Sequence, residues 1–352
     1  MKENSGDNRT ALAVVFGADA GIGVQAREVL APRADQVLVQ VAAAGCNRAD
    51  LLQRDGRYPA PAGVPSDIPG LEFSGTVVQV GELAHGLRVG DRVMGIYGGG
   101  AQAQYLLVPE SICVPVPEGL DVVDAGALPE AFFTAYEALV EQGGLRRGAR
   151  VLVNAVGSGV GTALVQLARA LGAQVYGTTR TQAKLEQCEA LGLSGGLVVE
   201  EGESPATTRE RLVALAGGEF DLAVDLLGGS HLSLLLAALA PQGTVVSLGF
   251  IAAQQASLDL ATIIARRLRV VGTSLRGRPN HEKAVLARRI TRDLLPLFAS
   301  GELRPVVDRR FPLEEAAAAY ARMEESRNFG KILLLPGAPV EGKSHDETAR
   351  GR

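Results

Sequence analysis

One segment near the middle of the chain constrains the fold most: the glycine-rich residues 154–161 (NAVGSGVG), which follow a hydrophobic run and open an amphipathic one. Residues 150–153 predict a short buried strand, and residues 162–171 place apolar side chains at helical spacing before Gly172. Glycines between a strand and a helix let the backbone approach a phosphate, which the free N–H groups and the positive helix end attract. Alone, such a glycine-rich sequence could also form an ordinary tight turn that binds nothing. The residues that follow it are therefore needed to distinguish the two possibilities.

The next predicted strand, residues 174–178, indicates which dinucleotide such a turn would bind. Folds that bind NAD carry Asp or Glu at the end of this strand to hold the ribose 2′-hydroxyl. Here Thr179, Arg180 and Lys184 follow, and no acid occurs before Glu186. Hydroxyl and cationic groups suit a 2′-phosphate, so the sequence predicts NADPH rather than NADH. The alternative is that Arg180 and Lys184 only begin a solvated helix.

Composition narrows the class of protein. A chain of 352 residues with 47% hydrophobic residues predicts about two domains with ample cores. The net charge of −4 and the 4% aromatic content argue against a nucleic-acid partner. Three cysteines without paired spacing or a signal peptide argue against a disulfide framework, and no apolar run is long enough for a membrane span. We therefore expect a cytoplasmic protein with neither a nucleic-acid nor a membrane partner.

The pattern along the chain predicts an interrupted domain. Short strands punctuated by prolines run from residue 10 to about 121, including 36–41, 75–80 and 92–95. Strands and helices then alternate to about residue 273. Helices are expected at 282–299 and 313–325, and strand 331–335 should close back onto the first domain. The predicted domains are 1–122 with 274–338, and 123–273 between them, with disordered ends before residue 10 and over 339–352.

A second glycine turn, residues 17–23, imitates the cofactor site of short-chain dehydrogenases. Those enzymes carry a Tyr followed four residues later by Lys, which none of the six tyrosines here has. A long helical pattern is also missing before Pro32. We therefore interpret residues 17–23 as the turn of a β-hairpin.

Several further motifs together resemble the zinc-free quinone oxidoreductase branch of the medium-chain dehydrogenase/reductase family, over residues 11–336. They are residues 47–51 (NRADL), 56–58 (GRY), 69–72 (PGLE), 98–105 (GGGAQAQY), 129–131 (PEA), 158–162 (SGVGT) and 330–332 (GKI). The resemblance implies an α/β protein: a GroES-like β domain formed by both ends of the chain, and an inserted Rossmann domain with a doubly wound parallel sheet. It also implies a cofactor cleft between the domains and a homodimer, for which strand 269–271 is a plausible edge.

The resemblance predicts no metal site. Zinc alcohol dehydrogenases place catalytic ligands where this chain has Asn47, Leu71 and Glu130, of which only the last could ligate. Cys46 lies one residue from the ligand position and is expected to be buried. The closely spaced cysteines of the structural zinc lobe are absent, and the four histidines are scattered.

Without zinc, an electron-poor acceptor is easier to reduce than an alcohol is to oxidise. A quinone can accept hydride directly from the nicotinamide, so the expected function is NADPH-dependent quinone reduction. By resemblance, Asn47 and Tyr58 are the catalytic candidates beside the nicotinamide, although Tyr58 could equally be a packed aromatic residue. Reduction of activated alkenes (enals, enones, enoyl thioesters) and a non-catalytic cofactor-binding scaffold remain alternatives.

The resemblance also assigns the cofactor contacts from the nicotinamide to the 2′-phosphate. The residues are Asn47, Thr134, Ser158, Gly159, Val160, Gly161, Thr179, Arg180, Lys184, Leu226, Gly249, Phe250, Ser274, Leu275 and Asn328. A human member of the branch has Tyr where this chain has Val199 and Lys where it has Ala183, and Arg180 is expected to compensate.

Overall fold

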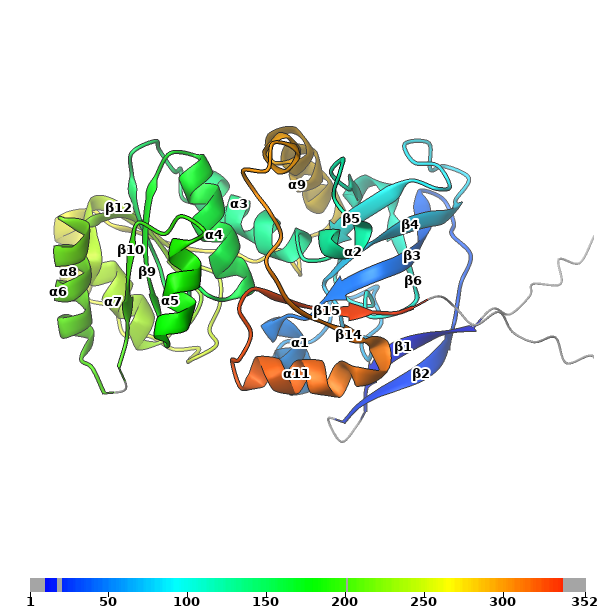
Figure 1. Ribbon diagram of the computed structural model, residues 1–352, viewed down its shortest axis with the longest axis horizontal. Coiled ribbons are helices and arrows are strands. Elements are labelled where there is room, and N and C mark those ends of the chain that lie inside the picture. The colour runs from blue at the N-terminus through cyan, green and yellow to red at the C-terminus, as the bar shows by residue number, and fades with distance from the viewer. Residues whose placement is uncertain (1–9, 18–20, 201, 338–352) are drawn as a thin grey trace, which may run out of the picture.

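The computed structural model describes residues 10–17, 21–200 and 202–337, which form two domains side by side (Figure 1). The predicted disordered ends and part of the predicted hairpin turn lie outside these residues. Among the helices that are described, none combines the length and apolar character needed to cross a bilayer.

The Rossmann domain is built on a six-stranded parallel sheet in the order β10-β9-β8-β11-β12-β13. Its strands are β8 (Arg150–Val153), β9 (Gln174–Thr179), β10 (Gly195–Val198), β11 (Phe220–Asp225), β12 (Leu239–Ser247) and β13 (Arg269–Gly272). Its helices are α4 (Gly159–Ala170), α5 (Gln182–Glu189), α6 (Pro205–Ala216), α7 (Ser230–Ala238) and α8 (Leu260–Arg266).

Side chains of the central strand β8 pack alternately into the hydrophobic cores on the two faces of this sheet. Val151 and Val153 join a core cluster with α4, whereas Leu152 joins a second cluster with α6 and α7. Burial on both faces explains why this parallel strand is a continuous hydrophobic run. The sheet therefore holds the glycine turn after β8 at its carboxyl edge, where α/β folds bind ligands.

The second domain is a seven-stranded sheet made by both ends of the chain, in the order β14-β15-β3-β4-β5-β7 with β6 paired to β3. Its strands are β3 (Gln36–Gly45), β4 (Glu72–Val80), β5 (Arg92–Ile96), β6 (Tyr105–Pro109), β7 (Val114–Pro115), β14 (Val307–Pro312) and β15 (Lys331–Leu335). Strand β15 pairs with β3, which confirms the expectation that residues 331–335 close onto the first domain.

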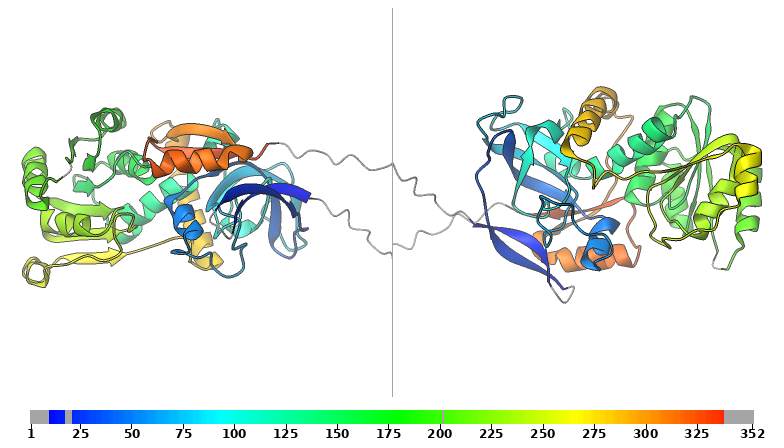
Figure 2. Two further views of the ribbon diagram at one scale, coloured as in Figure 1. Left: turned by 90° about the horizontal axis from the view of Figure 1, so that it is seen from below. Right: turned by 180° about the vertical axis from the view of Figure 1, so that it is seen from behind.

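The predicted hairpin is confirmed by its strands. Strands β1 (Thr10–Phe16) and β2 (Ile22–Glu28) pair antiparallel, with Phe16 opposite Ile22. Strands β1 and β2 therefore form a β ribbon beside the second domain, which Figure 2 shows from two further sides.

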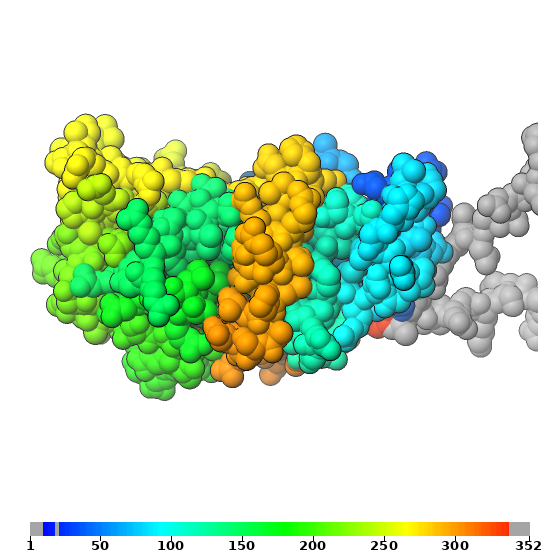
Figure 3. Space-filling view, turned by 90° about the horizontal axis from the view of Figure 1, so that it is seen from above, coloured from blue at the N-terminus to red at the C-terminus, as the bar shows by residue number. Residues whose placement is uncertain are grey.

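Helices connect and cover the two sheets. These are α1 (Arg48–Arg54), η1 (Glu110–Ile112), α2 (Val122–Ala125), η2 (Pro129–Phe133), α3 (Thr134–Tyr136), η3 (Glu137–Gln142), α9 (Asn280–Asp293), α10 (Leu295–Ala299), η4 (Leu313–Glu315) and α11 (Ala316–Glu324). The segments η2, α3 and η3 form one helical run with wide π-type turns. Residues of α9 and α10 lie as a band across the junction of the domains (Figure 3).

The structure differs from the sequence prediction in one part of the β segment. Residues 48–54 form α1, where only strands and turns were expected. The helix begins because the Asp50 carboxylate accepts from the Asn47 main-chain N–H at 2.8 Å, which satisfies a donor at the helix start. This helix is the element that brings Arg48 to the junction.

Candidate functional site

The glycine turn after β8 has the backbone geometry of a phosphate-binding turn. Ser158 is the N-cap of α4, and its Oγ accepts from the Gly161 main-chain N–H at 3.0 Å. A Cβ on Gly161 would lie 2.5 Å from the Ala155 carbonyl oxygen, so only glycine fits. Ala155 itself adopts a positive φ of 51°. The turn therefore presents its backbone at the positive end of a twelve-residue helix.

A buried polar pair fixes the strand ends beside this turn. Asn154 Nδ2 donates to Asp225 Oδ1 at 2.7 Å, and Asn154 Oδ1 accepts from the Leu226 main-chain N–H at 2.7 Å. The Asp225 carboxylate also accepts from the main-chain N–H groups of Leu227 and Gly228 and from Ser247 Oγ. These bonds hold the carboxyl ends of β8, β11 and β12 in register.

The second domain contributes the other side of the site. The Gly330 main-chain N–H donates to the Gly157 carbonyl oxygen at 3.1 Å, and Ser158 and Gly330 form a parallel bridge. Lys331 extends across the turn, and a Cβ on Gly159 would clash with its Cδ. The glycine turn therefore lies at the junction of the two domains.

A cluster of three cations lies beyond the end of β9. Lys184 Nζ donates to the Ser326 carbonyl oxygen at 2.7 Å, and Arg48 donates to Ser326 Oγ at 2.7 Å. Burial lowers the pKa of both side chains, and the nearby Arg180 charge lowers it further. Partly buried cations that lie close together repel one another, and this repulsion is relieved when an anion binds among them.

Arg48 is a member of this cluster that the sequence analysis missed. It lies 132 positions before Arg180 and belongs to the other domain, so spacing gave no sign of it. The signal that could have drawn attention to it was its place in the motif of residues 47–51.

The short helix α3, which packs against α4, contains a buried hydroxyl without a partner. Thr134 Oγ1 and Ser74 Oγ are the buried side-chain polar atoms for which the described residues offer no hydrogen bond. An unpaired buried hydroxyl costs about 1–3 kcal/mol. Thr134 is one of the predicted nicotinamide contacts, and a bound carboxamide or hydroxyl group would satisfy it. The glycine turn, the cations and this hydroxyl together fit a dinucleotide.

Asn47 is hydrogen-bonded to both members of a buried ion pair, Lys331 and Glu72. Lys331 Nζ lies 2.5 Å from Glu72 Oε1 and donates to Asn47 Oδ1 at 2.7 Å and to the Cys46 carbonyl oxygen at 3.0 Å. Asn47 Nδ2 donates to Glu72 Oε1 at 3.0 Å. Both ends of the Asn47 amide are therefore held, which makes it a rigid wall of the site. Cys46 is buried, as expected.

Tyr58 lies against a buried arginine. Its ring centroid is 5.0 Å from the Arg276 guanidinium carbon, and its carbonyl oxygen accepts from that guanidinium at 3.0 Å. Arg276 also donates to the Gly98 carbonyl oxygen and to Gln53. Tyr58 is thus a half-buried aromatic residue packed on Arg276, whereas its role as a hydrogen-bond donor stays a prediction.

The remaining predicted contacts fall into three groups. Leu226, Gly249 and Phe250 follow β11 and β12, and a Cβ on Gly249 would lie 2.9 Å from the Leu226 carbonyl oxygen. Thr179 is buried at the end of β9, and Asn328 Nδ2 donates to the Gly330 carbonyl oxygen at 2.8 Å. Val160 is partly buried at the start of α4.

Leu275 differs from the other predicted contacts. The whole residue is only 4% exposed, and it packs in the main hydrophobic cluster. The adjacent Ser274 is exposed, and its carbonyl oxygen accepts from Arg278. Of these two residues, Ser274 is therefore the one that a ligand can reach in this structure.

The pKa of Glu130 is shifted upward by this environment. Burial raises its pKa to about 7, and the Glu72 charge adds to the effect, whereas Lys331 and Arg276 oppose it. Asp50, which is fully buried below Asn47, has its pKa raised to about 6 by burial. Across residues 10–17, 21–200 and 202–337, no three His, Cys, Asp or Glu side chains are grouped as metal ligands.

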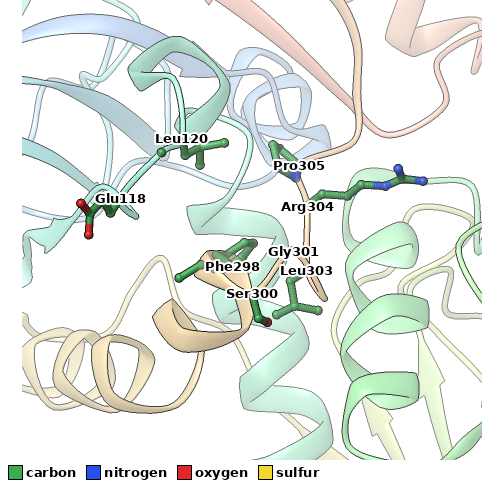
Figure 4. A pocket seen from close by; sticks show the side chains of 10 residues that line it. Glu118, Leu120, Phe298, Ser300, Gly301, Leu303, Arg304 and Pro305 are labelled. Carbon is green, nitrogen blue, oxygen red and sulfur yellow. The ribbon is translucent and has the colours of Figure 1, made fainter.

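A separate surface cavity of about 350 Å³ lies near α10 (Figure 4). It is lined by Leu120, Phe298, Leu303, Arg304 and Pro305 among others, none of which belongs to the predicted contacts. The cavity is therefore distinct from the site at the glycine turn.

Comparisons with known proteins agree with this geometry. The family model for the alcohol dehydrogenase GroES-like domain matches residues 33–118, and the model described as zinc-binding dehydrogenase matches residues 159–291. The rat synaptic vesicle membrane protein VAT-1 homolog is 31% identical over 345 residues, covering 93% of this chain and 83% of that protein.

Two further comparisons point the same way. The quinone oxidoreductase-like protein 2 homolog of Nematostella vectensis is 27% identical, covering 85% of this chain and 81% of its own length. The structure of an alcohol dehydrogenase superfamily protein from Novosphingobium aromaticivorans matches with a TM-score of 0.81 and 31% identity, covering 93% of this chain and 99% of that one. The chain therefore belongs to the medium-chain dehydrogenase/reductase family of NAD(P)-dependent oxidoreductases, in the branch of VAT-1 and quinone oxidoreductase-like proteins.

Proposed function

We propose that this protein reduces quinones with NADPH, by direct hydride transfer and without zinc. The observation that carries the proposal is the set of residues at the positions where zinc alcohol dehydrogenases bind metal. Asn47 is held at both ends of its amide, Leu71 is a buried aliphatic residue, and only Glu130 could ligate. Such a site lacks the ligands to polarise an alcohol, and it suits an acceptor that is already electron-poor.

The residues of the chain supply binding and orientation. Ser158, Gly159 and Gly161 would hold the pyrophosphate at the start of α4, and Thr134 Oγ1 would hold the nicotinamide end. The bound nicotinamide supplies the hydride. Asn47, locked between Glu72 and Lys331, forms a wall that restricts where the acceptor can lie.

The preference for NADPH is supported by the cations beyond β9. Burial and the charge of Arg180 lower the pKa of Arg48 and of Lys184, and the carboxylates that act against this are those of Glu324 and Asp308. A 2′-phosphate would bring a double negative charge to this cluster. A ribose 2′-hydroxyl would leave the three cations repelling one another.

We also propose a homodimer formed through the edge of the Rossmann sheet. Strand β13 ends that sheet, and its Val270 is 41% exposed. The adjoining helix α8 has no buried residue, and its Leu260 and Ile264 are 67% and 75% exposed. A second copy pairing at this edge would cover the unpaired strand and the apolar helix face together.

A spectrophotometric assay tests the proposed function. Purified protein treated with a chelator is given NADPH or NADH and, in turn, 1,4-benzoquinone, 9,10-phenanthrenequinone or 2-hexenal, and the loss of reduced nicotinamide is followed. We expect chelator-resistant turnover of the quinones with NADPH. The double variant Arg180→Ala with Lys184→Ala should lose most of that turnover at low NADPH.

The other outcomes separate the alternatives. Turnover of 2-hexenal alone would identify an alkene reductase, and loss of activity with the chelator would overturn the metal-free mechanism. Tight NADPH binding without oxidation by any acceptor would identify a cofactor-binding scaffold.

A further inference from the structure

Glu130 occupies a position that the proposed hydride transfer does not use. It is the second residue of η2, and its neighbours Ala131, Phe132 and Phe133 are buried while Glu130 keeps partial exposure. Thr134, the predicted nicotinamide contact, follows four residues later in the same helical run, and residues four apart share a helix face. Glu130 therefore lies on the side of the helix where the nicotinamide end of the site is expected.

The carboxyl group of Glu130 has no hydrogen-bond or ion-pair partner among the described residues. Its main-chain N–H donates to Glu72 Oε2 at 2.8 Å, but no described residue donates a hydrogen bond to its carboxyl oxygens or pairs with them. Glu72, only one hydrogen bond away, is in contrast ion-paired with Lys331. The two neighbouring glutamates thus have different environments. Such an arrangement keeps one carboxylate charged, here Glu72, and lets the other, here Glu130, carry a proton.

The cationic side chains around Glu130 form their hydrogen bonds with other groups. Lys331 Nζ is shared among Glu72, Asn47 and the Cys46 carbonyl oxygen. Arg276 donates to Gln53, to the Gly98 carbonyl oxygen and to the Tyr58 carbonyl oxygen. Lys283 Nζ donates to the Arg276 carbonyl oxygen at 2.9 Å. Because these charges are used elsewhere, burial and the repulsion of Glu72 and Asp50 dominate, and they raise the pKa of Glu130 to about 7.

Of the groups beside the expected nicotinamide, Glu130 is the one suited to carry a proton. Asn47 cannot ionise, and its amide is held by Glu72 and Lys331. Tyr58 packs its ring on Arg276. A carboxyl group that exchanges its proton near neutral pH is matched to general acid catalysis.

We propose that Glu130 is a catalytic general acid that protonates the reduced acceptor, an inference that rests on the proposed quinone reduction. A bound reduced nicotinamide would supply the hydride, which would bond with its electron pair to one quinone oxygen; the ring would become aromatic and the other quinone oxygen would gain the negative charge. The O–H bond of Glu130 breaks as its proton passes to that oxygen. The Glu130 carboxylate then regains a proton from water, and a quinone has become a hydroquinone at the expense of one reduced nicotinamide and one proton.

The test compares Glu130→Gln with a matched control, Glu141→Gln, which alters a partly exposed glutamate of the same helical run that pairs with Arg289. Quinone turnover at saturating NADPH is measured from pH 5 to 9. We expect the kcat of the native protein to fall as the pH rises through about 7. Glu130→Gln should lose about 100-fold in kcat at pH 6 and show no such dependence. Glu130→Asp should recover part of the loss.

Two readouts without turnover accompany the assay. NADPH binding, followed by the fluorescence of the reduced nicotinamide, should change less than about threefold in Glu130→Gln, which also verifies its fold. Infrared difference spectra of the ligand-free protein between pH 6 and 8 should contain the C=O band of a protonated carboxylic acid that disappears in Glu130→Gln and persists in Glu141→Gln.

The failures are distinguishable. Native protein that reduces no quinone removes the proposed function and the proton transfer with it. Active native protein whose kcat and pH profile are unchanged by Glu130→Gln overturns the general acid alone. The general acid is likewise overturned if Glu130 contributes no titrating carboxylic acid band over this pH range.

Discussion

The side chain of Lys331 fills the space that a Cβ on Gly159 would occupy, so the last strand of the chain closes directly over the turn that begins α4. Lys331 cannot easily move aside, because its Nζ is bound by Glu72, Asn47 and the Cys46 carbonyl oxygen. A single contact therefore couples the glycine turn of one domain to the buried ion pair of the other.

This contact makes Gly159→Ala costly to the whole protein. The added methyl must displace Lys331 or shift α4, which should lower the free energy of unfolding by about 1–3 kcal/mol. NADPH binding should weaken by about tenfold or more, because the turn moves with the helix start. Denaturant unfolding and fluorescence titration measure both. Gly23→Ala, at a position where a Cβ meets nothing within 4 Å, is the control and should change neither.

Arg48→Gln should weaken NADPH specifically. Losing one charged hydrogen bond to a 2′-phosphate costs about 1.5–3 kcal/mol, so the KM for NADPH should rise roughly tenfold or more. The KM for NADH, which lacks that phosphate, should stay within about twofold of the native value. Arg288→Gln, which changes an exposed arginine of α9, should leave both values unchanged. Equal losses for both cofactors would contradict a role of Arg48 in phosphate binding.

Thr134→Val should raise the stability of the ligand-free protein and lower its affinity for the cofactor. Valine keeps the shape of threonine but removes the unpaired hydroxyl, so the ligand-free protein should gain about 1 kcal/mol of unfolding free energy. Affinity for the reduced cofactor should fall by about three- to tenfold. Ser74→Ala removes the second unpaired buried hydroxyl and should not alter cofactor affinity. A Thr134→Val protein that is less stable than the native one would show that the hydroxyl has a partner.

The raised pKa of Glu130 also predicts how stability depends on pH. Between its ordinary value of 4.5 and its value of about 7 in the folded protein, the folded state holds a proton that the unfolded state releases. The contribution of Glu130 to stability should therefore fall as the pH rises through this window and stay low above it. Glu130→Gln lacks this loss. Its unfolding free energy relative to the native protein should rise from pH 4.5 to pH 7 and then level off, as measured by urea unfolding at each pH.

The proposed dimer predicts a response to charge at α8. Ile264→Glu places a carboxylate in the apolar face beside β13 and should raise the dimer dissociation constant by about 100-fold or more. Sedimentation velocity over a concentration series reports the shift to monomers. Leu83→Glu alters an equally apolar residue that is 59% exposed in the other domain, and should leave assembly unchanged. A native protein that sediments as a monomer at every concentration would contradict the proposal.

Several features of this protein were determined by the sequence alone, because they depend on residues close together in the chain. The glycine spacing of residues 154–161, the missing acid after β9 and the hydrophobic period of α4 all act within about thirty residues. They predicted the Rossmann unit, its helix and its edge strand β13, and the motifs at both ends predicted a second domain closed by residues 331–335. The domain boundaries and the roles of Asn47 and Tyr58 stay predictions.

The tertiary structure decided what depends on burial and on charges brought together through space. Arg48 lies near Arg180 because Arg48 and Lys184 both bind Ser326 after α11, and Lys331 reaches Gly159 because β15 pairs with β3. The pKa of the Glu130 carboxyl is raised to about 7 because folding buries it and places Glu72 beside it. These features could not be predicted from local sequence. A pKa or a steric contact depends on neighbours in space that lie tens to hundreds of residues away in the chain.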